Sequence, residues 1–185
     1  MENLFERILD SDEKIVKVLK PHKGKFFFSV LFTWGLSFLI FAIMGVFMVL
    51  FPDEGYEVNK IYLLLPIGLW IVCMLIVCLF ASIYYKNLYY AYSNKRIIIR
   101  SGIFGVDFKS LDMSMIGAVN VYVSLIDKIL RKDTGSIMFG STASPIGYGQ
   151  SAGSGYRFNN IKMPYETCKE VKSFIDTYKK EMQNK

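Results

Sequence analysis

Two long apolar runs stand out along the chain. Residues 26–51 and 61–85 contain no Asp, Glu, Lys, Arg or His, and the acidic segment 52–60 separates them. A helix needs about 20 apolar residues to cross the hydrocarbon core of a bilayer. One charge at its centre would cost roughly 2.5–3.5 kcal/mol. The runs therefore predict a transmembrane helical hairpin. A signal peptide is the alternative for the first run, but its apolar region would span only about 7–15 residues.

Basic residues gather beside these spans, on the side of both chain termini. They are Lys14, Lys17, Lys20, Lys23 and Lys25 before the first span and Lys86, Lys95, Arg96 and Arg100 after the second. The segment 52–60 holds Lys60 alone. Because Lys and Arg close to a span favour the cytoplasmic side, we expect a multi-pass protein of the plasma (inner) membrane with both termini in the cytoplasm.

Small hydroxyl residues recur every four positions in the first span. Ser29, Thr33 and Ser37 would lie on one helical face. Small residues let membrane helices approach closely, so these three are candidates for a packing seam with the second helix. The alternative is that they merely face lipid.

The apolar period shortens to two after Leu88. Short alternating runs predict antiparallel strands at 89–93, 95–102, 106–111, 117–123, 135–140 and 155–163. After Pro164 the period becomes helical, and one stripe holds Cys168, Val171, Phe174, Ile175 and Tyr178. The connector 124–132 is expected to be helical or irregular, with inward Leu125, Ile126, Ile129 and Leu130. Residues 86–185 thus predict a small β domain closed by a helix.

The N-terminal segment 1–25 begins with a short amphipathic pattern. Its apolar side chains are Leu4, Phe5, Ile8 and Leu9. A helix with this stripe could dock on the rest of the chain, on lipid or on a partner, and docking on the chain itself is the default expectation.

The charge is uneven along the chain. Residues 86–185 carry fifteen basic and eight acidic side chains, a net charge of +7. Such a domain suits an anionic membrane leaflet. It lacks the recognition motif or dense basic run of a nucleic-acid-binding protein, so we expect no nucleic-acid partner.

The residues of catalysis and metal binding are scarce. Cys73, Cys78 and Cys168 lack metal-binding spacing, and His22 is the only histidine. A single histidine nearly excludes catalytic triads and multi-histidine metal sites. We therefore expect no catalytic residue, no metal and no cofactor, and we do not expect an enzyme.

The run from Tyr89 to Ser141 resembles the bacterial pleckstrin-homology (PH)-like domain found in small membrane proteins behind a helical hairpin. The resemblance lies in NKRIIIRSG, in the Met115-Ile116-x-x-Val119 segment and in the leucine-rich connector. DEKIVKVLKPHKGKF resembles the stretch that precedes the hairpin. The resemblance implies a seven-stranded roll with one open end blocked by the C-terminal helix. The predicted fold is an α+β membrane protein, with a transmembrane hairpin at 26–85 and a cytoplasmic PH-like domain at 86–185.

The resemblance also indicates a region for ligands, although it does not imply phosphoinositide binding. In eukaryotic relatives of the fold, basic residues around the first hairpin hold inositol phosphates. Lys95, Arg96 and Arg100 occupy roughly that region and are candidates for binding an anionic ligand. The alternative is a solvated strand face. Residues 141–156, rich in Gly and Ser, are a second candidate surface, but they lack the Lys-Ser/Thr ending of a phosphate-binding loop.

The sequence as a whole predicts a non-enzymatic adaptor or scaffold at the membrane. Its hairpin would sit in the lipid bilayer and orient a module that binds a protein partner or assembles with itself. One alternative is a sensor of anionic lipid or of a membrane ligand through Lys95, Arg96 and Arg100. Another is an accessory subunit of a transporter or envelope enzyme complex that acts through its helices.

Overall fold

The computed structural model describes residues 4–51, 59–124, 127–128, 133–141 and 155–183, and it divides into two compact units. Lys23–Lys86 form the helical hairpin, and Met1–His22 together with Asn87–Lys185 form the β-domain. The predicted boundaries left residues 1–25 outside the PH-like domain. The structure instead groups Met1–His22 with it, so the hairpin is an insertion within one discontinuous domain.

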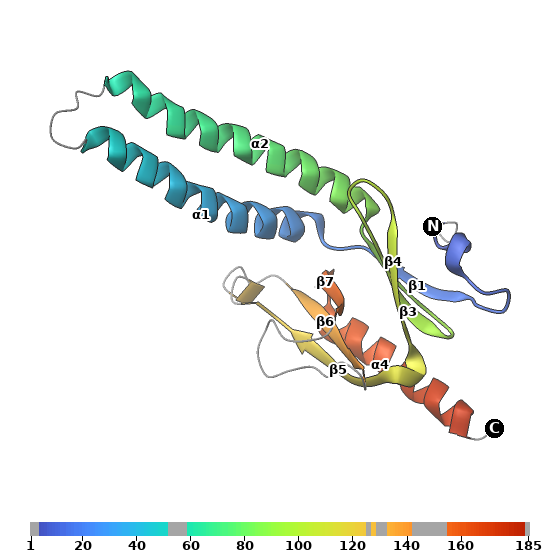
Figure 1. Ribbon diagram of the computed structural model, residues 1–185. Helices are drawn as coiled ribbons and strands as arrows, with labels where there is room; N and C mark the ends of the chain where they lie inside the picture. The colour runs from blue at the N-terminus through green and yellow to red at the C-terminus, as the bar shows by residue number, and fades with distance from the viewer. Residues whose placement is uncertain (1–3, 52–58, 125–126, 129–132, 142–154, 184–185) are drawn as a thin grey trace. The chain divides into compact units, whose positions relative to one another are not determined.

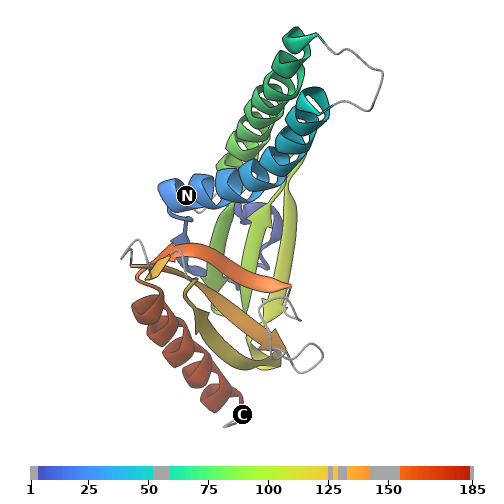
Figure 2. The ribbon, with the colours of Figure 1, turned by 90° about the vertical axis from the view of Figure 1, so that its left-hand side faces the viewer.

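The hairpin consists of α1 (Lys23–Leu50), the 3₁₀ turn η3 (Lys60–Leu63) and α2 (Leu64–Asn87). The two helices run side by side (Figures 1 and 2). Both are long and apolar enough to cross a membrane, judged by length and composition. Pro66 lies in the first turn of α2, where its missing N–H removes no intrahelical hydrogen bond.

The β-domain contains two antiparallel sheets. The first has the order β1 (Ile15–Leu19), β2 (Tyr89–Ser93), β3 (Arg96–Ser101) and β4 (Asp107–Asp112). The second has the order β5 (Ile116–Tyr122), β6 (Thr134–Ser141) and β7 (Tyr156–Lys162), and η4 (Met113–Met115) joins the sheets. The six strands predicted after the hairpin are confirmed. β1 was not predicted.

The C-terminal helix α4 (Pro164–Gln183) lies beside the β5–β7 sheet (Figures 1 and 2). Val171 and Ile175, from the predicted apolar stripe, are buried, and the Phe174 ring lies 5.9 Å from that of Tyr92 in β2. Gly135 in β6 allows this packing, because a Cβ atom there would lie 2.9 Å from Cγ of Pro164. The helix therefore contacts both sheets.

Aromatic side chains form the core between the sheets. The Tyr90 ring of β2 stacks on Phe158 of β7 at 4.8 Å, and Phe139 of β6 meets Phe158 edge-on at 4.8 Å. All three side chains are essentially inaccessible to solvent. The described strands thus form a seven-stranded roll closed by a C-terminal helix, and the predicted α+β fold is confirmed. Leu125, Ile126, Ile129 and Leu130, and nearly all of 141–156, lie outside the described residues.

Candidate functional site

The face of β3 that carries the predicted basic residues is partly covered by the N-terminal arm, residues 4–22. Arg96, Ile98 and Arg100 lie at every second position of β3 and therefore share one face of the strand, as predicted. Phe5 is fully buried in a cluster with Ile98 and Ala91. The expectation that the N-terminal segment docks on the chain itself is confirmed, although the described helix there is only the three-residue η2 (Glu6–Ile8).

Arg96 forms a two-pronged ion pair with Glu13 of the arm. Its Nε and Nη2 donate to the Glu13 carboxylate at 3.0 and 2.8 Å, and Nη2 also donates to the Ile8 carbonyl at 2.6 Å. The Glu13 side chain is fully buried and also accepts a hydrogen bond from Ser93 Oγ at 2.5 Å. This geometry is typical of strong Arg–carboxylate recognition.

The surroundings of Glu13 favour its ionised form. Burial by itself raises the pKa of this carboxyl. Hydrogen bonds from Arg96, Ser93 and the Asp10 N–H together lower the pKa by more than burial raises it, so the pKa lies below its usual value. Glu13 and Arg96 are therefore both charged at neutral pH.

Lys95 binds the arm through exposed carboxylates. Its Nζ lies 2.6 Å from Asp12 Oδ1 and 3.5 Å from Asp10 Oδ2. An anionic ligand at this end of β3 would compete with these carboxylates and with Glu13. The prediction that Lys95 and Arg96 bind such a ligand stays a prediction.

Arg100 lies at the opposite end of β3. Four residues at about 3.3 Å each separate it from Arg96 by roughly 13 Å. Its guanidinium lies 5.6 Å from the ring centre of Tyr89. Lys20 lies 4.4 Å from the same ring centre and donates to the Tyr89 hydroxyl at 3.0 Å. The three predicted basic residues therefore do not form one cluster, and sequence reasoning missed that Lys20 and Arg100 both lie against the Tyr89 ring.

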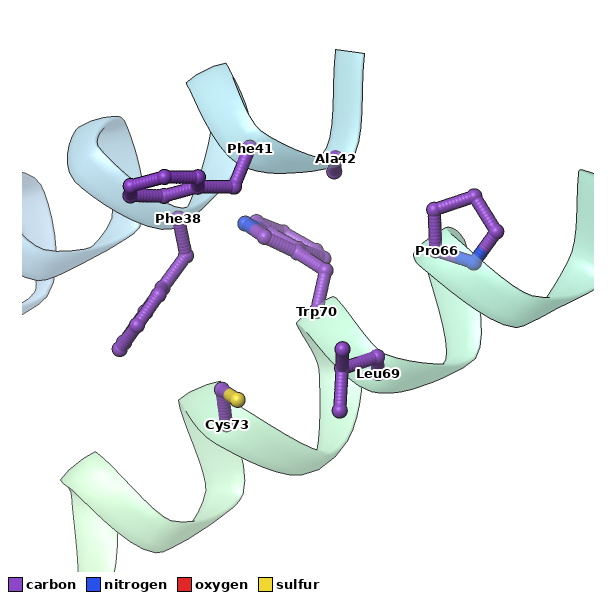
Figure 3. A pocket seen from close by; sticks show the side chains of 7 residues that line it. All are labelled: Phe38, Phe41, Ala42, Pro66, Leu69, Trp70 and Cys73. Carbon is purple, nitrogen blue, oxygen red and sulfur yellow. The ribbon is translucent and has the colours of Figure 1, made fainter. Parts of the chain in front are cut away.

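The hairpin contains an apolar groove of about 290 Å³ (Figure 3). Its lining residues are Phe38, Phe41 and Ala42 of α1 and Pro66, Leu69, Trp70 and Cys73 of α2. Trp70 Nε1 donates to the Gly35 carbonyl at 3.5 Å, which links the two helices beside the groove. None of the described residues that line the groove is charged, so its lining suits an apolar group.

The two helices approach closely at Gly45. A Cβ atom on Gly45 would lie 2.9 Å from Cβ of Pro66. Thr33 and Ser37 are exposed, and their hydroxyls donate to the carbonyls of Ser29 and Thr33 at 2.9 and 3.0 Å. The prediction that Ser29, Thr33 and Ser37 form a packing seam stays a prediction.

A groove of about 320 Å³ lies beside Asp127. Ser124 Oγ and Thr134 Oγ1 each donate to this buried carboxylate at 2.5 Å, and the Asp127 N–H points back to Ser124 Oγ at 3.3 Å. The Ser124 N–H also donates to Asp127 Oδ2 at 3.3 Å, so each side chain accepts from the backbone N–H of the other residue, which is the pattern of a capping box. Within the described ranges, no group of three or more His, Cys, Asp or Glu side chains could hold a metal ion.

A seven-stranded antiparallel roll closed by a C-terminal helix defines a PH-like protein. The family model described as the bacterial PH domain matches residues 29–182, and the chain belongs to this family. The match includes most of both hairpin helices as well as β2–β7. No curated protein and no solved structure matched the chain.

Proposed function

We propose that this protein is a non-enzymatic adaptor or scaffold, anchored in the plasma membrane by α1 and α2, with its β-domain in the cytoplasm. The observation that carries the proposal is the pairing of β1 with β2, in which Leu19 lies opposite Tyr90. In the chain, the whole hairpin is inserted between these two adjacent strands. Both of its ends therefore join the β-domain at the same end of the first sheet. Two covalent attachments hold the domain at the membrane surface and raise its local concentration there.

The surface of the hairpin supports insertion into a bilayer. Phe41 and Met48 are each 69% exposed and Leu79 is 67% exposed, and the most apolar stretch of each helix has no residue buried within the chain. A helix that is apolar on all sides must be covered by protein or lipid. The basic residues beside both spans support a cytoplasmic position for the termini.

The anchoring is tested by thiol labelling in intact cells. Cys73, Cys78 and Cys168 are replaced by Ser, and one cysteine is introduced by Asp53→Cys or Lys180→Cys. A membrane-impermeant maleimide is expected to label the first variant in intact cells and the second only after permeabilisation. The opposite result, or equal labelling of both, would contradict the proposed topology.

The adaptor role is tested by proximity labelling. A biotin ligase is fused after Lys185 of the full chain, and the control is the same ligase fused directly to the hairpin, residues 23–86. We expect specific proteins enriched only with the full chain. Enrichment of other copies of this chain would indicate a self-assembling scaffold. Equal enrichment with the hairpin alone would favour an accessory subunit that acts through its helices, and would contradict the adaptor role.

The lipid-sensor alternative predicts salt-sensitive binding to anionic vesicles through Lys95, Arg96 and Arg100. It has less support, because Arg96 already binds Glu13 and because Arg100 lies at the other end of the strand. PH-like domains are generally non-catalytic, which supports a binding role over an enzymatic one.

A further inference from the structure

The turn between β3 and β4, residues 102–106, presents large apolar side chains to solvent. Phe104 is 91% exposed, the largest value for a large apolar side chain in the described part of the chain. Ile103 and Val106 are 38% and 41% exposed. Turn positions usually carry Gly, Asn, Asp, Ser or Pro, so three bulky apolar residues in this turn need an explanation. A solvent-exposed tip of this kind indicates a surface that contacts something apolar.

The base of this turn is fixed by its backbone. Gly102 has φ of +142°, and a Cβ atom there would collide with the carbonyl oxygen of Gly105. Ser101 and Asp107 pair across the two strands directly below the turn. The shape of the turn therefore depends on glycine, and the strand pairing holds the apolar side chains at the end of the sheet.

The turn also lies where the chain returns from its apolar span. Asn87, the last residue of α2, donates its side-chain N–H to the Gly102 carbonyl at 3.1 Å. Tyr89 follows directly and lies opposite Arg100 in the sheet. Lys20, at the end of β1, contacts the same tyrosine.

The chemistry at this edge matches a membrane interface. Tyrosine rings settle at headgroup depth, and Lys and Arg reach anionic headgroups while their stems cover apolar surface. A basic side chain close to an anionic leaflet is attracted to it. The apolar turn extends from this edge beside Lys20, Tyr89 and Arg100.

We propose that the turn 102–106 inserts Phe104, flanked by Ile103 and Val106, into the headgroup and upper acyl region of the leaflet from which α2 emerges. This inference rests on the proposed function, because it requires that the hairpin spans the bilayer. The turn then supplies a third attachment besides the two ends of the hairpin. The added contact at β3 and β4 restricts how far the β-domain can tilt against the membrane.

The test uses the full chain in vesicles of phosphatidylcholine and phosphatidylglycerol. In a background with Cys73, Cys78 and Cys168 replaced by Ser, the environment-sensitive fluorophore NBD is attached through Phe104→Cys. The matched control is Met115→Cys, which replaces an apolar side chain that is 52% exposed beyond the opposite end of β4. We expect the label at position 104 to emit at shorter wavelength and to be quenched severalfold more by lipids carrying a nitroxide on the acyl chain.

A third labelled protein separates the two proposals. It retains Cys73 within α2 and carries Ser at the other two cysteine positions. The label at Cys73 can be quenched while the label at 104 is quenched no more than the label at 115. In that case the proposed insertion of the turn is wrong, and the proposed membrane anchor is supported. A blue-shifted label at 104 without lipid quenching would show that protein covers the turn, which also overturns the inference. If the label at Cys73 is not quenched, the proposed membrane anchor itself is wrong.

Discussion

Arg96 and Lys95 are adjacent basic residues with different structural roles. The Glu13 carboxylate that Arg96 binds is fully buried, and the Arg96 side chain is 21% exposed. Lys95 is 34% exposed, and its partner Asp12 is 72% exposed. Removing one partner of a buried pair leaves an uncompensated charge, whereas an exposed pair is screened by water and salt.

We predict that Arg96→Ala destabilises the β-domain strongly and that Lys95→Ala does not. Loss of Arg96, the partner of the buried Glu13 carboxylate, should lower the free energy of unfolding by about 3 kcal/mol. The measurement is pulse proteolysis of the full chain in urea and a mild detergent. Lys95→Ala is the matched control, because it removes a basic side chain from the adjacent position. Equal stability of the two variants would show that the arm is not held by the pair with Glu13.

A pH dependence follows from the lowered pKa of Glu13. A carboxyl whose pKa is lower in the folded state than in the unfolded state stabilises the fold at pH values above its unfolded-state pKa. This stabilisation is lost as the pH falls through the folded-state pKa. We predict that Glu13→Gln destabilises the chain most near pH 7. The difference in free energy of unfolding between this variant and the unchanged chain should shrink below about pH 4.3, the ordinary pKa of a Glu side chain. Urea unfolding measured between pH 7 and pH 3 checks this, and a difference independent of pH would contradict it.

At the scale of elements, the two hairpin helices are in close contact at Gly45. Gly45 has space for hydrogen only, since its Cβ would lie 2.9 Å from Cβ of Pro66. The ring of Pro66 cannot rotate away, so α1 and α2 must separate to admit a methyl group. At Gly68 of α2, by contrast, an added Cβ atom would have no atom of the described residues within 4 Å.

We predict that Gly45→Ala weakens the pairing of α1 with α2 and that Gly68→Ala does not. Small residues allow close packing where lipid supplies no hydrophobic drive for association. The measurement is the thermal unfolding midpoint of the full chain in detergent, followed by helix content. Gly45→Ala should lower the midpoint by several degrees. An unchanged midpoint with Gly45→Ala would show that the helices are not held at this contact.

The elements that the sequence predicted are those with a local pattern. The strands of residues 89–162 alternate in period two, and the hairpin and α4 have long apolar runs or stripes. β1 has only five residues, and it lacks a clear alternation because Ile15, Val16, Val18 and Leu19 are all apolar. Its partner strand lies beyond the whole hairpin, so no neighbouring hairpin turn indicates the pairing.

The details of the candidate sites were less predictable because they depend on distant contacts. Arg96 and Glu13 are 83 residues apart, so their pairing could not be read from either segment alone. The rotation of α1 about its axis was equally undetermined, since Gly35, Gly45 and the hydroxyl residues are all small. The apolar turn did carry a signal in SGIFGVD, where glycines flank large apolar residues.

At the scale of the whole molecule, the β-domain is built from two chain segments that meet at adjacent strands. The arm supplies β1 to the open edge of β2, and it supplies Phe5 and Glu13 to cover Ile98 and Arg96. An uncovered strand edge is a site for aggregation. The arm is therefore part of the folded domain, and the chain enters and leaves the hairpin from the paired strands β1 and β2.

We predict that the β-domain folds without its hairpin when His22 is joined to Asn87 by about four Gly and Ser residues. Leu19 and Tyr90 are paired neighbours, so a short loop suffices to connect antiparallel strands. The joined protein should be soluble and show cooperative urea unfolding by circular dichroism. The control is residues 87–185 alone, which lack β1 and the partners of Arg96 and Ile98, and this chain should aggregate or unfold without a cooperative transition. If residues 87–185 alone were as stable as the joined protein, the arm would not be needed for folding. Deleting the arm from the full chain would then leave the domain intact.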